Sequence, residues 1–212
     1  MPPRAPNVQP RPRDATATRE RILAAVGTLL VREGFGALGV NAVAREAGVD
    51  KVLIYRYFGG MDELLETWGN HSDFWPSVEE MLGAVPETEP AQLAAGLLKR
   101  HLQALRARPH TLEVMAWEEV TRHPLTRVLD RIREERSERL MKALPAGLRA
   151  SGLDLAALSA LLGAGMQHLL LRSRTVAVFN GVPLDTADGW PRLEGALDLI
   201  CERLFAGAAS QA

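Results

Sequence analysis

Residues 51–57, KVLIYRY, place two cations and two tyrosines beside apolar side chains in one short run. In a helix whose buried side carries Ile54 and Phe58, the remaining side chains point outward or sideways. Exposed apolar groups are unfavourable on a free surface. They suit a DNA major groove, where they meet thymine methyls while Arg and Tyr reach phosphates. The outward residues are Lys51, Val52, Leu53, Tyr55, Arg56 and Tyr57. An alternative is a pair of helices packed on the rest of the chain, with the tyrosine hydroxyls at the rim.

The residues before this run predict the element that would position it. Small side chains on a helix over about 40–47 would let a second helix, over about 50–58, approach closely. Gly48 between them can adopt the left-handed conformation that a sharp turn requires. Asp50 is a suitable N-cap for the second helix. The pattern indicates a helix-turn-helix.

A longer helix is expected before this pair, from about Thr18, a possible N-cap, to Gly34, a natural C-terminal stop. Residues 1–15 are rich in Pro and Arg and are predicted to form a disordered basic arm. Residues 16–60 are then a three-helix domain, and residues 61–212 a larger helical domain. Because no strand-like alternation of useful length appears, the predicted fold class is all-α.

Charge is distributed unevenly along a chain whose formal net charge is −1: residues 1–60 carry +4 and the remainder −5. A basic first module on an acidic body is what polyanion binding would explain. The N-terminus lacks the apolar core of a signal peptide, and the uncharged run 155–171 is shorter than a membrane span. A cytoplasmic protein with no membrane partner is therefore expected. The single cysteine, Cys201, excludes an intrachain disulfide and a cysteine metal cluster.

The run GFGALGVNAVAREAGVDKVLIYRYFGGMDELL, residues 34–65, resembles the DNA-binding domain of TetR-family transcriptional regulators. The family's short motifs occur at the family's spacing, at Gly34–Phe35, Val43–Ala44, Ala47–Gly48–Val49, Tyr55–Phe58 and Asp62–Leu64. The resemblance implies base reading by Lys51, Val52, Leu53 and Tyr55, and phosphate contacts by Tyr55, Arg56 and Tyr57. It adds Gly39 and Asn41, at the start of the preceding helix, to the DNA-binding set.

Two departures from the family pattern concern DNA affinity. The family usually caps the helix before the turn with Ser or Thr, whereas Leu38 and Gly39 stand here. This change weakens the cap by roughly a few tenths of a kcal/mol and removes a phosphate donor. Met61 stands where the family commonly carries a phosphate-binding Lys. An arm bearing Arg4, Arg11, Arg13 and Arg19 is expected to offset both losses by lying in the minor groove or along phosphates.

For the larger domain, the resemblance implies homodimerisation and small-molecule sensing. Residues 154–173 are apolar around nearly the whole helix circumference, and a last helix is expected over about 191–205. Two such helices from each subunit would form a four-helix interface. The expected interface residues are Leu158, Leu162, Leu169, Leu193, Leu197, Ile200 and Leu204. The alternative is that both are core helices of a monomer.

Aromatic residues at helical spacing suggest where a small molecule could bind. Trp68, His71 and Trp75 would share one helix face. Together with Met115, Trp117 and His168 they are the candidate lining of an adaptable apolar pocket. The acids Glu113, Glu118 and Glu119 could select a cationic ligand if one of them were buried. The alternative is that the aromatic residues are ordinary core.

Catalytic and cofactor motifs are missing from the sequence: it contains no HExxH, GxGxxG, GK[ST] or GxSxG. A non-enzymatic protein without cofactor or metal is predicted. The interpretation is a homodimeric transcriptional regulator, a repressor that leaves a palindromic operator when a small apolar or amphipathic ligand binds. The alternatives are a helical protein-interaction module and a DNA-binding regulator without a small-molecule inducer.

Overall fold

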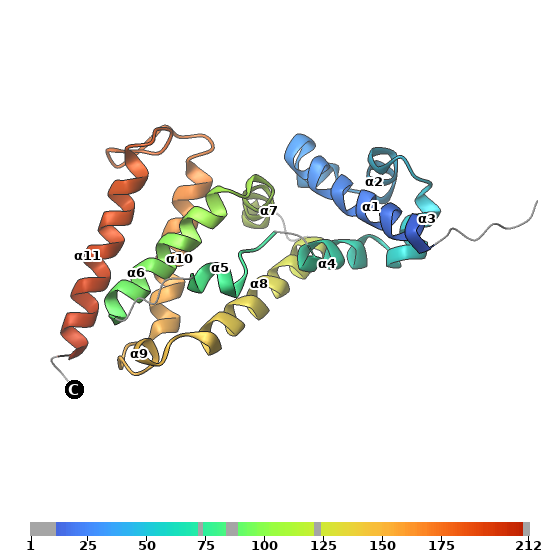
Figure 1. Cartoon of the computed structure of the whole chain (residues 1–212). Coiled ribbons are helices and arrows are strands. Elements are labelled where there is room, and N and C mark those ends of the chain that lie inside the picture. Colours follow the sequence, from blue (N-terminus) through green and yellow to red (C-terminus); the bar gives the residue numbers. More distant parts are fainter. Residues whose placement is uncertain (1–11, 72–73, 84–88, 121–123, 210–212) are drawn as a thin grey trace, which may run out of the picture.

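The computed structural model describes residues 12–71, 74–83, 89–120 and 124–209, which are almost entirely helical (Figure 1). The N-terminal helices are α1 (Pro12–Glu33), the 3-10 helix η1 (Phe35–Ala37), α2 (Val40–Ala47) and α3 (Lys51–Phe58). They are followed by α4 (Met61–His71), α5 (Val78–Leu82), α6 (Pro90–Arg106), α7 (Pro109–Val120), α8 (Pro124–Ala143), α9 (Ala146–Arg149), α10 (Leu155–Arg172) and α11 (Gly189–Ala209). The predicted all-α fold class is confirmed.

We call α1, η1, α2 and α3 the head, and the helices from α4 onward the body. The head lies at one end of the molecule and α11 at the other, with α4 and α8 between them (Figure 1). In the body, α6 packs against both α10 and α11, while α4 packs against α8. Helix α4 approaches α8 closely at Gly69, where a Cβ atom would lie 2.8 Å from Leu129 Cδ2.

The first helix begins at Pro12, not near Thr18, so residues 12–15 of the predicted disordered arm are helical. A proline fits the first turn of a helix because its missing N–H has no intrahelical partner there and its φ is already helical. Residues 1–11 of the arm lie outside the described residues.

A two-residue antiparallel hairpin, β1 (Val178–Phe179) and β2 (Val182–Pro183), joins α10 to α11 and was not predicted. Its turn residues, Asn180 and Gly181, have φ of 48° and 76°. Asn-Gly is the preferred pair for such a tight hairpin turn, so the sequence carried a signal for it.

One buried cluster runs without interruption from the head into the body. It includes Ile22 and Ile54 of the head, Leu65 of α4 and Val114 of α7, each fully buried. A second, smaller cluster lies between α6, α9 and α11, around Leu148 and Cys201. Cys201 is buried there, and burial raises the pKa of its thiol. Since the head shares its core with α4 and α7, movement of either body helix acts on the head directly.

Candidate nucleic-acid interface and ligand cavity

Helix α3 presents an outward side built as the sequence predicts. Asp50 Oδ1 accepts a hydrogen bond from Val52 N at 2.8 Å, which caps the helix. Ile54 and Phe58 are buried, while Val52 is 62% and Tyr55 54% exposed.

Lys51 and Arg56 are also exposed, and Leu53 and Tyr57 are half-buried. Two apolar surfaces and two cations thus share the free side of one short helix. This combination can contact both base edges and phosphates.

The turn before α3 has the geometry that its residues predict. Gly48 adopts φ 63° and ψ 41°, the left-handed conformation that favours glycine. At the start of α2, Gly39 is the N-cap with an extended backbone, and no side chain caps the helix. Asn41, two residues later in the first turn, is exposed. The space around Gly39 is open, because an added Cβ would meet nothing within 4 Å.

Arg19 lies within α1 and contacts the end of α3. Its Nη1 donates to Tyr57 O at 2.8 Å, and its guanidinium lies 4.5 Å from the centre of the Phe58 ring. Arg19 therefore caps the C-terminal end of α3 from within the head. The sequence does not predict this contact, because a basic residue near an arm gives no indication of which backbone carbonyl lies within its reach.

Surface ion pairs fix α2 on α1. Arg32 donates to both carboxylate oxygens of Glu46, at 3.1 and 2.7 Å, and also to Glu33. The hydrogen bonds from Arg32 lower the pKa of Glu46, and those to Glu46 and Glu33 raise the pKa of Arg32. The two-point contact sets the rotation of α2 relative to α1.

A second contact between head and body involves η1 and α7. The Phe35 and Trp117 ring centroids are 5.7 Å apart. A Cβ atom at Gly36 would lie 2.6 Å from Trp117 Cζ2, so only glycine permits this approach. Arg174, just after α10, donates to Glu113 and to Leu112 O and so ties the end of α10 to α7.

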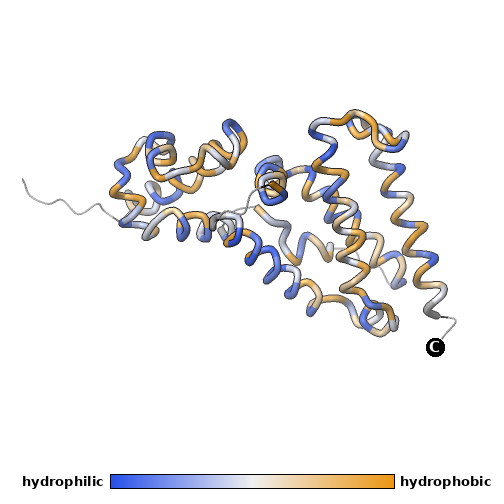
Figure 2. Tube along the Cα trace, turned by 180° about the vertical axis from the view of Figure 1, so that it is seen from behind, coloured by the Kyte–Doolittle hydropathy of each residue, from blue (hydrophilic) through white to orange (hydrophobic). Residues whose placement is uncertain are grey.

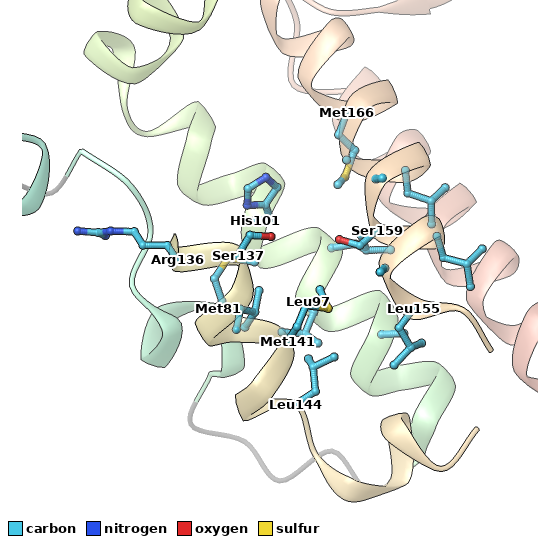
Figure 3. A pocket seen from close by; sticks show the side chains of 18 of the residues that line it. Met81, Leu97, His101, Arg136, Ser137, Met141, Leu144, Leu155, Ser159 and Met166 are labelled. Carbon is cyan, nitrogen blue, oxygen red and sulfur yellow. The ribbon is translucent and has the colours of Figure 1, made fainter. Parts of the chain in front are cut away.

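The body contains a cavity of about 870 Å³ between α5, α6, α8, α10 and α11 (Figure 3). Most of its lining is apolar, with contributions from Met81, Leu97, Met141, Leu144, Leu155 and Met166. Polar side chains add to it, and Figure 3 shows His101 of α6 and Ser137 of α8 among them. Burial lowers the pKa of His101 to about 4, so its imidazole is neutral at neutral pH. A cavity of this size and composition suits a small amphipathic molecule.

The predicted pocket residues whose side chains are described do not share one pocket. Trp75 lines the large cavity, and Met115 lines a second cavity of about 760 Å³. Trp68 is buried against Phe74, with ring centroids 4.7 Å apart. His71 ends α4, and its side chain is outside the described part.

Two further pocket candidates also lie elsewhere. Trp117 packs on the head, and His168 is exposed and meets Phe179 edge-on at 5.6 Å. Helical spacing groups residues of one helix, but the cavity draws its lining from six helices, α9 included through Leu148. Sequence reasoning missed His101, although its position in the stripe Leu97, His101 and Leu105 signals a buried histidine.

The acids proposed to select a cation are placed differently from one another. Glu118 lines the second cavity, where its Oε2 accepts from Arg133 Nη1 at 2.6 Å. Arg133 also donates to Asp130. One oxygen of Glu118 is therefore paired with an arginine, while its Oε1 is buried without a hydrogen-bond partner among the described residues.

Most of the predicted dimer residues are half-buried within the chain. Leu197 is buried against α6, and Leu169 and Leu193 pack on the core. Leu158, Leu162 and Leu204 are half-buried and line the cavity. Ile200, 39% exposed, is the one member of the predicted set that is classed as exposed.

The outward apolar surface of α10 and α11 uses other residues. Leu161 is 73% and Leu199 54% exposed, and Ala157 and Ala164 extend the α10 surface. Figure 2 shows hydrophobic residues recurring along α11 at the edge of the molecule. The sequence does not separate this surface from the predicted set, because a stripe that packs on α6 has the same spacing as one that packs on a partner.

By length and composition, one helix in the described part of the chain, α10, could cross a membrane; only 11% of it is buried within the chain. Among the described residues, no group of three or more His, Cys, Asp or Glu side chains is placed to hold a metal ion.

Comparisons with known proteins agree with this geometry. Residues 22–67 match the family described as bacterial regulatory proteins, tetR family, and the match spans the head and the start of α4. No curated protein matches the chain.

Solved structures with the same fold cover most of the chain. A TetR family transcription regulator from Marinobacter aquaeolei VT8 has a TM-score of 0.56 at 15% identity and covers 92% of this chain and 97% of its own. FadR from Bacillus subtilis, solved in complex with stearoyl-CoA, has a TM-score of 0.63 at 16% identity, covering 86% and 96%. NalD of Pseudomonas aeruginosa, the secondary repressor of the MexAB-OprM multidrug efflux pump, has a TM-score of 0.58 at 18% identity, covering 90% and 96%.

Residues 22–67 therefore match the tetR family of bacterial regulatory proteins in sequence, and the whole chain shares the two-part helical fold of solved TetR family regulators.

Proposed function

We propose that the protein is a homodimeric, non-enzymatic repressor that binds a palindromic operator and leaves it when a small apolar or amphipathic molecule enters the body. The observation that carries the DNA-binding half is the free side of α3, where Val52 and Tyr55 are exposed beside Lys51 and Arg56. Such a side is unfavourable in water and favourable in a major groove. A cytoplasmic location follows from a DNA partner in a bacterium.

A dimer is needed because one helix-turn-helix contacts too few bases to select a site. The exposed apolar surface of α10 and α11, centred on Leu161 and Leu199, supports association through these two helices. Two copies would place two α3 helices on successive major grooves, roughly 34 Å apart.

A chain of aromatic contacts supports ligand control. Trp75 lines the cavity, and its ring centroid lies 4.8 Å from that of Phe74. Phe74 in turn lies 4.7 Å from Trp68, which belongs to α4. α4 continues into α3 through Gly59 and Gly60. A ligand that moves Trp75 would therefore shift α4 and change the distance between the two α3 helices of the dimer.

The comparisons supply partial support for a ligand. FadR, which has this fold, was solved with stearoyl-CoA bound. The apolar lining around Met81, Leu97 and Met141 would accept an acyl-like chain in this protein too. The ligand would release DNA only to the extent that it binds the conformation unable to bind DNA more tightly than the DNA-binding one. A ligand with equal affinity for both conformations would leave the equilibrium between them unchanged.

The first test is selection of bound duplexes from a random pool at two salt concentrations, with the full-length protein. We expect a palindromic consensus whose binding weakens steeply with salt, because phosphate contacts release counterions. A variant with Lys51→Ala and Tyr55→Ala, both on the exposed side of α3, should lose the consensus and keep its fold. Salt-independent binding to a protein partner, with no consensus, would instead support a protein-interaction module.

A further inference from the structure

Three polar side chains form one layer of the large cavity's lining. Each lies one helical turn away from an apolar lining residue of the same helix, so the two share a helix face. The pairs are His101 with Leu97 on α6, Ser137 with Met141 on α8, and Ser159 with Leu155 on α10. Figure 3 shows the three polar side chains toward one end of the lining and the three apolar ones toward the other. The cavity is therefore divided into a polar layer and an apolar layer.

The His101 ring has hydrogen-bonding capacity that the chain leaves unused. His101 is half-buried, and its ring nitrogens have no hydrogen-bond partner in the part of the chain that the structure describes. Those nitrogens are not among the enclosed atoms without a partner, which are Trp75 Nε1 and Glu118 Oε1. Because burial lowers its pKa to about 4, the imidazole is neutral at neutral pH and offers one donor and one acceptor. A molecule in the cavity can use both.

The two serine hydroxyls add to the same layer. Neither Ser137 nor Ser159 has a hydrogen-bond partner among the described residues. Figure 3 shows their hydroxyl oxygens pointing toward each other from α8 and α10. Since a hydroxyl both donates and accepts, the polar layer can bind an uncharged group of either kind.

The cations of the lining are occupied elsewhere. Arg133 is paired with both Glu118 and Asp130. Arg136 donates to Trp75 O at 2.9 Å, and Figure 3 shows its side chain extending away from the other lining side chains. Neither guanidinium is therefore placed to receive an anionic head group in the polar layer.

The acids of the lining are on the water side of it. Glu134 and Glu138 are both exposed, and Glu138 pairs with Lys142 at 3.5 Å. Water solvates these carboxylates, so they offer little to a cation inside the cavity. A charged head group of either sign would lose its own hydration without gaining a counter-charge, which is far more costly than burying an uncharged polar group.

We propose that the cavity binds an uncharged amphiphile, an alcohol or a carbonyl compound, whose polar group hydrogen-bonds with His101, Ser137 and Ser159 and whose apolar part lies against Met141 and Leu155. This inference rests on the proposed function for the cavity's role and adds the chemical class of the ligand.

The test uses three probes with the same ten-carbon chain: 1-decanol, decanoate and decyltrimethylammonium. Titration calorimetry measures their binding to the full-length protein without DNA at neutral pH, within the solubility of decanol and below the concentrations at which the ions form micelles. We expect decanol to bind at least about tenfold more tightly than either ion, because only the ions lose the hydration of a charge. Equal or tighter binding of either ion would overturn the proposal, and so would the absence of decanol binding.

A substitution separates the hydrogen bonds from apolar attraction alone. His101→Leu makes the cavity more apolar, so a ligand held only by apolar contacts would bind this variant equally well or better. We expect decanol to bind it about tenfold more weakly instead, because its polar group loses a partner. The control is His168→Leu, which should leave decanol affinity unchanged, since His168 is exposed and does not line the cavity. Unchanged or higher decanol affinity in His101→Leu would overturn the proposal.

The serines provide a second test that leaves the imidazole in place. The double variant Ser137→Ala and Ser159→Ala should weaken decanol binding roughly tenfold, because two hydroxyl partners are lost. Alanine is tolerated in both helices, so this variant decides the question if His101→Leu fails to fold. Decanol affinity equal to that of the unaltered protein would refute the polar layer as a binding site.

The two proposals fail separately. If decanol binds through His101 but leaves an operator complex intact, the ligand class stands and the release mechanism fails. If operator binding is present and decanol does not bind, the DNA-binding function stands and the site for an uncharged ligand is wrong.

Discussion

Arg19 and Arg56 both lie next to α3, but their guanidinium groups meet different surroundings. Arg19 is occupied by Tyr57 O and the Phe58 ring, so it holds the helix in place. Arg56 is exposed on the side that would face DNA. The same residue type therefore contributes to folding at one position and to binding at the other.

Glutamine substitutions separate these two contributions. Arg56→Gln should reduce the slope of log affinity against log salt by about one, because one phosphate contact is lost. Arg19→Gln should instead lower the free energy of unfolding by about 1 kcal/mol and leave that slope unchanged. Binding isotherms at several salt concentrations and urea unfolding measure the two effects. A reduced salt slope in Arg19→Gln would return this residue to the DNA-binding set.

His101 predicts a pH dependence of stability. Its pKa is lowered from an ordinary 6.5 to about 4 by burial. As the pH falls from 7 to 4, the unfolded chain takes up the proton before the folded chain does, so stability decreases by at most about 3 kcal/mol. His101→Gln should remove this part of the acid sensitivity. Urea unfolding at pH 7 and pH 4.5 for both proteins isolates it from the carboxylates, and identical losses would contradict the prediction.

At the scale of elements, the contact between η1 and α7 depends on two residues that fit only each other. An added methyl at Gly36 would meet the Trp117 ring at 2.6 Å. The Trp117 ring cannot move freely, because Phe35 packs against it. The neighbouring position is also tight, since a Cβ atom added at Gly34 would lie 3.0 Å from Glu113 Oε1. The head is therefore seated on α7 with little tolerance.

Gly36→Ala should destabilise the protein by about 1–3 kcal/mol through overpacking. Trp117→Leu alone should also destabilise it, by loss of the half-buried ring. Combining them should cost less than the sum, because the smaller side chain leaves room for the methyl. Thermal unfolding of the two single variants and the double variant measures the coupling. If the losses in the free energy of unfolding of the two single variants simply add in the double variant, the two residues are not coupled and the prediction is wrong.

The elements also show what the sequence could predict. The helix-turn-helix was predicted in detail because its signals, the Gly48 turn and the Asp50 cap, act within a few neighbouring residues. The cavity was not, because Trp75, His101 and Arg136 come from three segments that only the fold brings together. On α11, Leu197 has the spacing of an interface residue, yet it packs on α6. Periodicity identifies a buried side but not the partner that buries it.

At the scale of the whole molecule, the last two helices, α10 and α11, carry exposed apolar surface. Leu161 and Leu199 are largely exposed on α10 and α11, and α10 itself is mostly unburied. Exposed apolar surface of this kind is what the proposed association with a second copy would cover. A two-fold pairing would match the symmetry of a palindromic operator.

Leu161→Glu should therefore convert the dimer to monomer at micromolar concentration, because it would bury an unpaired charge. Operator affinity should fall with it, since the two heads would no longer bind as a linked pair. Val31→Glu is the control, because Val31 is 60% exposed on α1, away from this surface. Sedimentation equilibrium gives the oligomeric state. A dimeric Leu161→Glu variant would move the interface elsewhere.

The contacts between head and body have a mechanical consequence. The head is joined to α4 through Gly59 and Gly60, and its α1 and η1 pack against α7, where Phe35 meets Trp117. Because α1 also contacts α4, the head follows the body through several contacts at once. Arg174 ties α7 to the end of α10, the helix that carries exposed apolar surface. A shift transmitted through α7 would therefore reach the helix through which we propose that two copies associate.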